Sequence, residues 1–351
     1  MGMGGKFGFG LVGTGLIAGV HAEALRDVGE GRLVAVCSRS SERGKNFAAR
    51  YGCRAYGSVE ALATDPEVDA LLIATPSGSH LEPSLVAAKA GKHVLCEKPL
   101  EINLERIDRL IAAHREAGTR LGCIFQLRYM PVLDPIRQAL DSGRFGRLTY
   151  AGVTVPWWRE PAYYADSPWH GDRRLAGGGA MLSQAIHSLD LICDLMPPIE
   201  EVKGMAGIVG HDGIETEDVA VGLVRFQGGA LGSLYGTTAS WPGCPKRFEI
   251  TGTEGTVICE DDHLLLWRFR DENEGDRIIW ERFGPHTGGK AHGVSDPAAI
   301  SHDLHAACIA DFIRSVREGR RFRIEGSSAR RPVALIEALL ENASTPGRRP
   351  V

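Results

Sequence analysis

The chain has 351 residues, with 40 lysines and arginines against 44 aspartates and glutamates and a hydrophobic fraction of 43%. At roughly 150 residues per domain this length predicts two domains, and the charged fraction of 24% is that of a folded protein, which excludes general disorder. The formal net charge of −4 offers no basic surface for nucleic acid, and no apolar run approaches the roughly 18 residues of a membrane span.

The cysteines and the N-terminus predict a cellular location. Eight cysteines are scattered along the chain with no Cys-x-x-Cys pair. In a chain of this size, such scattering is typical of reduced thiols in a cytoplasm rather than of a disulfide framework or a zinc site. Residues 1–6 lack the charged-then-apolar pattern of a secretory signal, and Lys6 stands where a myristoylation motif has Ser or Thr. We therefore expect a cytoplasmic protein without membrane attachment.

Apolar strands and helices alternate through the first 127 residues. The apolar runs predict strands at 7–12, 33–38, 68–74, 93–96 and 121–125. Helices are expected between them, at 18–28, at 41–51 after a Ser41 cap, at 81–90 before Gly91, and after an Asn103 cap up to 117. Continuous apolar strands separated by helices indicate a parallel sheet covered on both faces. Residues 1–127 are therefore predicted to form a doubly wound, dinucleotide-binding Rossmann domain.

The second part of the chain, 128–351, has a different pattern. Short strands joined by Gly-containing turns are expected at 150–155, 219–226, 231–238, 248–251, 256–259 and 264–268. Helices are expected at 177–195, 301–318 and 332–341. This pattern predicts an α+β domain with an open, mostly antiparallel sheet, with packing of the last helix on the first domain as an alternative. Residues 284–297 are expected to form a long loop, either functional or disordered.

A Gly-rich turn joins the first expected strand to the first helix. The residues Gly13, Thr14, Gly15, Leu16, Ile17 and Ala18 fit the pattern G-x-G-x-x-G/A. Glycines let the backbone approach a pyrophosphate, and the helix N-terminus adds N–H donors and a positive dipole. Some methyltransferases share the motif, but its place at the first strand–helix junction favours a dinucleotide.

The end of the second strand bears on which dinucleotide binds. Sites for NAD(H) commonly have a carboxylate there, which holds the ribose hydroxyls, whereas this chain has Ser38, Arg39 and Ser40. A guanidinium beside two hydroxyls suits a 2′-phosphate, so NADP(H) is favoured and NAD(H) remains the alternative. Arg39 facing solvent, or stacking on the adenine of either cofactor, is the competing interpretation.

Polar segments also follow the third and fourth apolar strands. Thr75, Pro76, Ser77 and His80 follow the first of these, and Glu97, Lys98 and Pro99 follow the second. A doubly wound sheet binds its ligand at the carboxyl ends of its strands. We therefore expect Thr75, Pro76, Ser77, His80, Glu97 and Lys98 to border the cofactor.

The ordered set of motifs resembles a known family. The Gly13–Ala18 turn, the Thr75-Pro76…His80 segment, Gly-Lys-His-Val-x-x-Glu-Lys-Pro ending at Pro99, and the Gly-rich stretch 177–190 follow the order and spacing of the Gfo/Idh/MocA oxidoreductases. The resemblance implies a Rossmann domain followed by a domain whose open sheet forms a homodimer or homotetramer. It also implies hydride transfer between a nicotinamide and a sugar, a cyclitol or a related polyol.

Two residues match the catalytic positions of that family, Lys98 and His187. Imidazole titrates near neutrality and suits a base that takes the hydroxyl proton, while an ammonium stabilises charge that develops on the reacting oxygen. The alternatives are a surface lysine and a helix histidine bonded to backbone. The family often has Asp four residues before the histidine, where this chain has Ser183, which can orient the ring but adds no charge. Asp190 is a further candidate for assistance.

An aromatic segment precedes the Gly-rich stretch, and its residues suit a sugar ring that stacks and hydrogen-bonds. Core or oligomer packing is the alternative. The substrate-binding candidates, with two that follow the last Rossmann strand, are Arg128, Tyr129, Trp158, Arg159, Tyr164, Trp169, Ser183 and His187. His302 and His305 have helical spacing, and we expect a structural or cleft-facing role for them rather than a metal site.

Two other functions compete with a dehydrogenase or reductase. A glycosidase, epimerase or lyase that retains its cofactor would oxidise the sugar transiently and show no net change in the cofactor. A dinucleotide-binding regulator would bind without catalysis and would not need the pair Lys98 and His187, both of which are present. The expected ligand in all three cases is a small molecule.

Overall fold

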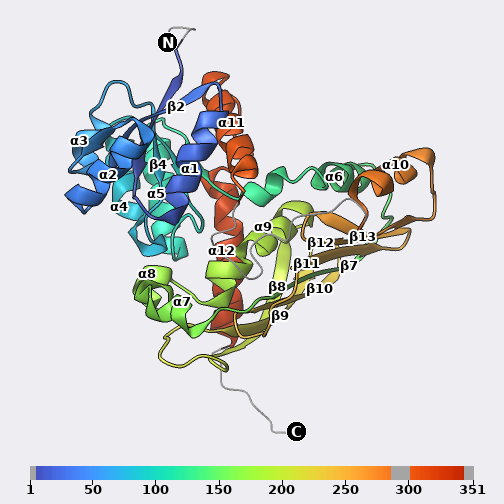
Figure 1. Ribbon diagram of the computed structural model, residues 1–351. Helices are drawn as coiled ribbons and strands as arrows, with labels where there is room; N and C mark the ends of the chain where they lie inside the picture. Colours follow the sequence, from blue (N-terminus) through green and yellow to red (C-terminus); the bar gives the residue numbers. More distant parts are fainter. Residues whose placement is uncertain (1–4, 286–300, 344–351) are drawn as a thin grey trace. The chain divides into compact units, whose positions relative to one another are not determined.

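The computed structural model describes residues 5–285 and 301–343, which form two compact units (Figure 1). The first unit contains the described residues up to Tyr129 together with those from 301 to Arg330, and the second contains the others. The segment after residue 300 thus returns to the first unit, whereas the sequence prediction placed a single boundary after residue 127. The expected loop at 284–297 lies outside the described residues except for its first two.

The first unit contains a six-stranded parallel sheet. Its strands lie in the order β3 (Arg54–Tyr56), β2 (Gly31–Cys37), β1 (Phe7–Val12), β4 (Ala70–Ile73), β5 (His93–Cys96) and β6 (Leu121–Cys123). This is the doubly wound dinucleotide-binding order, in which the chain changes direction across the sheet between β1 and β4. The predicted fold class of this part is confirmed, and the ligand edge is the carboxyl end of the strands.

Helices cover both faces of this sheet, as neighbouring residues of β1 show. Phe9 contacts Phe312 of α11 (Asp303–Arg317), which lies beside α1 (Leu16–Asp27) on one face (Figure 1). A Cβ on the next residue, Gly10, would meet Leu62 of α3 (Val59–Ala63) on the other face. The remaining helices of this unit are α2 (Ser41–Tyr51), α4 (Leu81–Lys89) and α5 (Leu104–Glu116).

Two short elements of the first unit were not predicted, and one cap was misplaced. The strand β3 has only three residues and none of them is buried, so it carries no apolar run, and α3 has only five residues. The Oγ atom of Ser40, not of Ser41, caps α2 by accepting the N–H of Arg43 at 3.3 Å. Asn103 caps α5, as the sequence predicted.

The second unit contains a seven-stranded, mostly antiparallel sheet, as predicted. In order, its strands are β13 (His263–Phe269), β12 (Gly255–Glu260), β11 (Arg247–Gly252), β7 (Leu148–Pro156), β10 (Leu231–Thr237), β9 (Val219–Phe226) and β8 (Ile199–Gly207). Only β7 and β10 pair in parallel; the other neighbours are antiparallel. The strand β8 was missed because none of its nine residues is buried, so it shows no apolar alternation.

One face of this sheet is covered and the other carries exposed apolar side chains. A π-helical turn at Ala180–Ala185, α9 (Ile186–Leu195) and α12 (Gly326–Ala343) lie on the covered face, where a Cβ on Gly222 would meet Leu339 of α12. Along β9 buried and exposed residues alternate, which leaves Val221 and Leu223 on the opposite face. The other helices are α6 (Leu133–Asp141), α7 (Pro161–Ala165), α8 (Arg173–Ala176) and α10 (Glu274–Phe283).

The last helix is longer than expected. We predicted that it starts at Pro332, but α12 begins at Gly326 and holds Pro332 in its interior. Proline removes one helical N–H bond, and the residues Ala329 and Val333 on either side of it are buried.

None of the helices within the described ranges combines the length and the apolarity needed to cross a membrane.

Candidate active site

The turn between β1 and α1 has the features of a dinucleotide cradle. Gly13 has φ of +116°, and a Cβ there would lie 2.4 Å from the carbonyl oxygen of Ala74, so only glycine fits. Gly15 precedes α1 without a side-chain cap, and no acidic residue lies in the first helical turn. A Cβ on Gly15 would meet nothing within 4 Å, and Leu16 is 60% exposed. The helix N-terminus is therefore suited to an anionic pyrophosphate.

The end of β2 presents hydroxyl and guanidinium groups. The hydroxyl oxygens of Thr14 and Ser38 lie 3.2 Å apart, and Arg39 is exposed. Arg43, which the sequence prediction did not single out, donates from Nη2 to the carbonyl oxygen of Thr14 at 3.4 Å. The position of Arg43 in the first turn of α2, after the Ser40 cap, is the sequence feature that could have indicated a contact with this loop.

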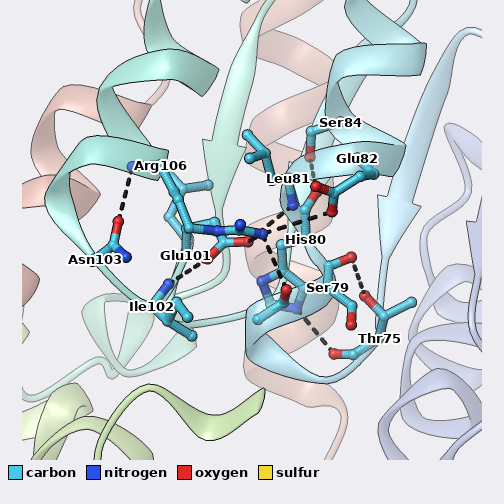
Figure 2. A network of polar contacts seen from close by, with 12 residues as sticks. Thr75, Ser79, His80, Leu81, Glu82, Ser84, Glu101, Ile102, Asn103 and Arg106 are labelled. Carbon is cyan, nitrogen blue, oxygen red and sulfur yellow. Dashed lines mark hydrogen bonds and ion pairs between the residues drawn. The ribbon is translucent and has the colours of Figure 1, made fainter. Parts of the chain in front are cut away.

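His80 is buried between the loops that follow β4 and β5. It is 1% exposed, and both ring nitrogens have backbone partners. Nε2 lies 2.9 Å from the carbonyl oxygen of Thr75 (Figure 2), and Nδ1 lies 2.9 Å from the carbonyl oxygen of Pro99. The Thr75 hydroxyl donates to the oxygen of Ser79, and Ser77 is buried. His80 thus joins the two loops, and its ring nitrogens are already used.

Glu97 holds the backbone of the loop that carries Lys98. Its Oε1 lies 2.7 Å from Nε2 of His21, and its Oε2 accepts the N–H of Lys98 at 3.1 Å. Burial would raise the pKa of Glu97, but the hydrogen bond and charge of His21, with help from His305 and Lys98, lower it to about 2. The carboxylate is therefore ionised, and the Lys98 side chain is half-buried at the end of β5.

Arg128 and Tyr129 lie in the interior of the first unit. Arg128 is 1% exposed and donates from Nη1 to the hydroxyl of Ser328 at 2.9 Å. The Tyr129 hydroxyl donates to Asp311 at 2.7 Å, and burial raises its pKa far above the ordinary value. The substrate role that their position after the last Rossmann strand predicted for these two residues stays a prediction.

The predicted helix at 177–195 is divided in the structure. The π-helical turn at Ala180–Ala185 comes first, and α9 follows. The buried carboxylate of Glu217 accepts the N–H groups of Gly179 and Met181, both at 3.0 Å. A Cβ on Gly179 would lie 1.7 Å from the backbone carbonyl oxygen of Glu217. Burial raises the pKa of Glu217, although these backbone bonds oppose the shift. Glu217 thus fixes the start of a π-helical turn, a feature common at functional sites.

Ser183 and His187 lie on either side of the junction between these two helical segments. The Ser183 hydroxyl donates to the oxygen of Gly178 at 3.1 Å, and His187 is half-buried as the second residue of α9. Asp190 is fully buried in the same helix. The α-helical rule that places residues four apart on one face does not apply directly across a π-helical turn. The role of Ser183 in orienting His187 stays a prediction.

Arg159 and its aromatic neighbours connect to the π-helical turn. Arg159 is 4% exposed and donates from Nη2 to Oε1 of Gln184 at 2.9 Å, while the Gln184 amide donates to the Tyr163 hydroxyl at 2.9 Å. The guanidinium also lies 5.0 Å from the ring centroid of Trp157. Burial lowers the pKa of Arg159, and the two neighbouring tyrosines oppose that shift. Gln184 was not predicted, although it lies beside Ser183 in the Gly-rich stretch.

The other aromatic candidates belong to the same region of the second unit. The Tyr164 and Thr238 hydroxyl oxygens lie 2.9 Å apart, and the Trp158 indole donates to Glu160 at 2.7 Å. The ring centroid of His170 lies 4.0 Å from that of Tyr163 and 4.1 Å from that of Trp169. The ring centroid of His211 lies 5.6 Å from that of Trp158 and 5.0 Å from that of Tyr164, and its Nε2 lies 2.8 Å from the carbonyl oxygen of Arg159. Together these contacts join Trp158, Arg159, Tyr164 and Trp169 to the π-helical turn.

His302 and His305 occupy different surroundings. His302 bonds Asp27 at 2.8 Å, and Asp303 completes a group whose ligand atoms lie within 4.8 Å of one another. His305 is buried with its ring centroid 5.3 Å from that of His21, and burial lowers its pKa to about 4. Burial therefore favours the neutral form of His305, and the structural role expected for the two histidines stays a prediction.

Family models match most of the described chain. The model for the Gfo/Idh/MocA oxidoreductases with an NAD-binding Rossmann fold matches residues 7–125. The model for the C-terminal domain of the same family matches residues 134–258. Each match falls within one of the two units.

Individual relatives support the same assignment. A 1,5-anhydro-D-fructose reductase of Ensifer adhaerens is 36% identical over 256 residues, which are 71% of this chain and 74% of the relative. A myo-inositol 2-dehydrogenase of Thermotoga maritima is 30% identical over 76% of this chain and 79% of its own length. Among solved structures, the WlbA dehydrogenase of Bordetella pertussis in complex with NADH and UDP-GlcNAcA has a TM-score of 0.88 and 30% identity, covering 96% of this chain and 95% of that one.

The Gly-rich cradle and the Glu97–Lys98 loop lie within the range that the first family model matches, and the Gly-rich stretch ending in α9 lies within the range of the second. As the ordered motifs predicted, this chain belongs to the Gfo/Idh/MocA family of NAD-binding oxidoreductases.

Proposed function

We propose that this protein transfers hydride between a nicotinamide dinucleotide and a hydroxyl or ketone group of a sugar, a cyclitol or a related polyol. The observation that carries the proposal is the loop after β5, where Glu97 accepts the Lys98 N–H and so holds the lysine at the ligand edge of the sheet. The reductase and the inositol dehydrogenase among the relatives support this substrate class. The aromatic cluster around Arg159 suits a sugar ring.

Lys98 and His187 have complementary roles in this proposal. When bound, the nicotinamide supplies or accepts the hydride. Lys98 donates a hydrogen bond to the reacting oxygen and stabilises its negative charge. His187 takes the hydroxyl proton during oxidation and returns it during reduction. The cradle at Gly13 and Gly15 binds the pyrophosphate, and Thr75 and Pro76 border the same edge of the sheet.

A substrate panel tests the activity. Sugars, anhydrosugars and cyclitols are offered with each nicotinamide cofactor in both redox states, and absorbance and product mass are followed together. We expect reduction or oxidation of the cofactor with a product that differs by two hydrogens. A changed product without net change of the cofactor would instead establish a cofactor-retaining enzyme. Cofactor binding without any turnover across the panel would favour a regulator.

We further propose that NADP(H) is the preferred cofactor. The end of β2 has no acidic residue in the stretch Ser38-Arg39-Ser40, and Arg43 bonds the backbone of Thr14 in the cradle. Two guanidinium groups beside hydroxyls suit a 2′-phosphate, and each charge-assisted bond contributes about 1.5–3 kcal/mol. One such bond alone gives a preference of roughly ten- to hundredfold.

Titration of both cofactors against Arg39→Ala and Arg43→Ala tests this preference. We expect each substitution to weaken NADP(H) by at least roughly tenfold and NAD(H) much less. Arg50→Ala is the matched control, because Arg50 lies on the same helix but stacks on Tyr51. Equal weakening of both cofactors would show that the arginines stack on the adenine, and the phosphate interpretation would be wrong.

We also propose that the exposed sheet face of the second unit forms a homodimer or homotetramer. Met205, Val221, Leu223 and Leu231 are 46–70% exposed on the adjacent strands β8, β9 and β10. Neighbouring exposed apolar residues on a sheet are typical of an interface. Leu223→Asp should shift the mass in sedimentation toward the monomer, whereas Ile278→Asp on α10, which is 56% exposed, should not. An unchanged mass in the first variant would exclude this face.

The cysteines support a reducing, cytoplasmic location. The eight cysteines all lie in the part of the chain that the structure describes, where none of them forms a disulfide, and six of them are buried. Alkylation during cell lysis, followed by mass spectrometry of the denatured chain, should label all eight thiols. Thiols protected from alkylation until a reductant is added would contradict this location.

A further inference from the structure

Among the described residues, the hydrogen-bond partners of the His80 ring are two acceptors and no donor. Nε2 is 2.9 Å from the carbonyl oxygen of Thr75 (Figure 2). Nδ1 is 2.9 Å from the carbonyl oxygen of Pro99. The residue is 1% exposed, so solvent does not supply alternative partners. The ring therefore spans the gap between the loop after β4 and the loop after β5.

The number of protons on the ring follows from these partners. A carbonyl oxygen only accepts, and a neutral imidazole has one N–H and one lone pair. A neutral ring would therefore point its lone pair at one of the two oxygens, whereas an imidazolium donates to both. We infer that His80 is held as an imidazolium, whose two N–H groups clamp Thr75 to Pro99 and so position the neighbouring Lys98.

Charged groups of both signs lie beside the peptide that follows the His80 ring. Glu101 is fully buried, and its Oε1 accepts the N–H of Leu81, the residue after His80, at 3.0 Å. Arg106 of α5 donates to the same Oε1 at 2.8 Å and also to the oxygen of Gly78 at 3.1 Å.

Glu82 of α4 lies 3.6 Å from Arg106 and is exposed. Lys98, next to Pro99 in the sequence, adds a second positive charge to these surroundings of the His80 ring. The buried carboxylate of Glu101 lies beside the peptide that follows the ring. Buried cations persist where such hydrogen bonds and charges compensate for lost hydration.

The clamp makes His80 a positioning residue and not a catalytic one. Both ring nitrogens are occupied by backbone, so the ring has no free atom for cofactor or substrate. Glu97 holds the N–H of Lys98 from one side of the residue, and His80 holds the carbonyl of Pro99 from the other. The two contacts together restrain the backbone on both sides of the Lys98 side chain.

The protonation state is measured directly by nitrogen NMR of the full chain labelled with ¹⁵N-histidine. We expect two protonated ring nitrogens for His80 at neutral and mildly alkaline pH. The signals are assigned by their absence in His80→Gln. His114 is the internal control, because it is equally buried, its Nδ1 contacts the Thr119 hydroxyl, and burial lowers its pKa to about 4. It should show a single N–H. A single N–H on His80 would overturn the inference.

Turnover provides a second readout, and it rests on the proposed function through Lys98. Glutamine donates from one nitrogen only, so His80→Gln should release one loop and lower kcat by roughly 10- to 100-fold, with a smaller change in the KM of the cofactor. His93→Gln on β5 is the control, because a glutamine oxygen can accept the Arg120 N–H as His93 Nδ1 does. An unchanged kcat in His80→Gln would contradict the positioning role. If no substrate were found, the NMR result would still decide the protonation state.

Discussion

The two predicted catalytic residues are held in different ways. Lys98 lies in a loop of the first unit, and side chains from distant positions fix that loop: Glu97 with His21, and His80. His187 lies in a helical segment of the second unit. The carboxylate of Glu217 fixes the start of that segment, and the backbone hydrogen bonds of the helix hold the residues that follow. A loop needs several side-chain contacts because its backbone has no repeating bonds, whereas a helix needs partners only at its ends.

The largest expected effect is at Lys98 itself. Lys98→Met removes the ammonium and keeps the length of the side chain, so the reacting oxygen loses its donor. We expect kcat to fall by about 10²- to 10³-fold, as for loss of an oxyanion donor, with little change in cofactor affinity. Lys89→Met, an exposed position on α4, is the control in steady-state kinetics and cofactor titration. Turnover close to wild type would remove Lys98 from the mechanism.

The corresponding contact in the second unit is Glu217. In Glu217→Gln the side chain has one acceptor oxygen, so either Gly179 or Met181 loses its partner. A buried N–H left without an acceptor costs about 1–3 kcal/mol of unfolding free energy, and a displaced π-helical turn should lower kcat roughly tenfold or more. Glu215→Gln is the matched control, because Glu215 is exposed and accepts the N–H of Arg173 at 3.1 Å. Equal stability of the two variants would show that Glu217 does not fix the turn.

Local patterns allowed much of this architecture to be predicted from the sequence. The apolar strands of the first unit and the alternation along β9 indicated their sheets, because burial leaves a period in the chain. The strand β8 and the helix α10 have no buried residues and left no such sign.

The same distinction applies to the site. The motifs located the Lys98 loop and the Gly-rich stretch, but they did not indicate the contacts between Glu97 and His21 or between Glu217 and Gly179. Those partners are 76 and 38 residues apart, and only tertiary packing brings them together. For the same reason the sequence did not indicate the contact of Arg128 with Ser328, which lies 200 residues further along the chain.

The buried histidines that support the first unit predict a loss of stability in acid. Burial lowers the pKa of His305, and that of His114, to about 4, whereas an unfolded histidine titrates near 6.5. Between these values the unfolded chain binds a proton that the folded chain does not. The unfolding free energy should therefore fall as pH decreases from about 6.5 to 4, by up to about 1.4 kcal/mol per pH unit for each histidine. Glu97 adds a slope of the same sign at the acidic end of this range, because its folded pKa of about 2 lies below the ordinary glutamate value and only the unfolded chain then binds a proton there.

Urea titrations of wild type and His305→Gln across this pH range measure the slope. In the variant, the slope of the unfolding free energy against pH should be smaller by about the contribution of one proton. Far-UV circular dichroism reports both units, whereas tryptophan fluorescence reports only the second, since all six tryptophans lie between residues 157 and 280. The comparison of the two probes shows whether the second unit follows the first. An unchanged slope in the variant would mean that His305 is not buried as a neutral group.

The smallest effect is expected at Ser183, and it tests whether His187 is the titrating base. A carboxylate at position 183 would favour imidazolium over imidazole. Ser183→Asp should therefore move the acidic limb of the activity–pH curve to higher pH, by less than about one unit because His187 is only half-buried. The substitution also removes the hydroxyl that donates to Gly178, which weakens the start of the segment. Ser183→Ala loses the same bond without adding charge, so it separates the two effects. If the acidic limb of the activity–pH curve moves equally in both variants, the shift reflects the lost hydrogen bond. If it moves in neither variant, either His187 does not titrate in the rate-limiting step or Asp190 already supplies the negative charge.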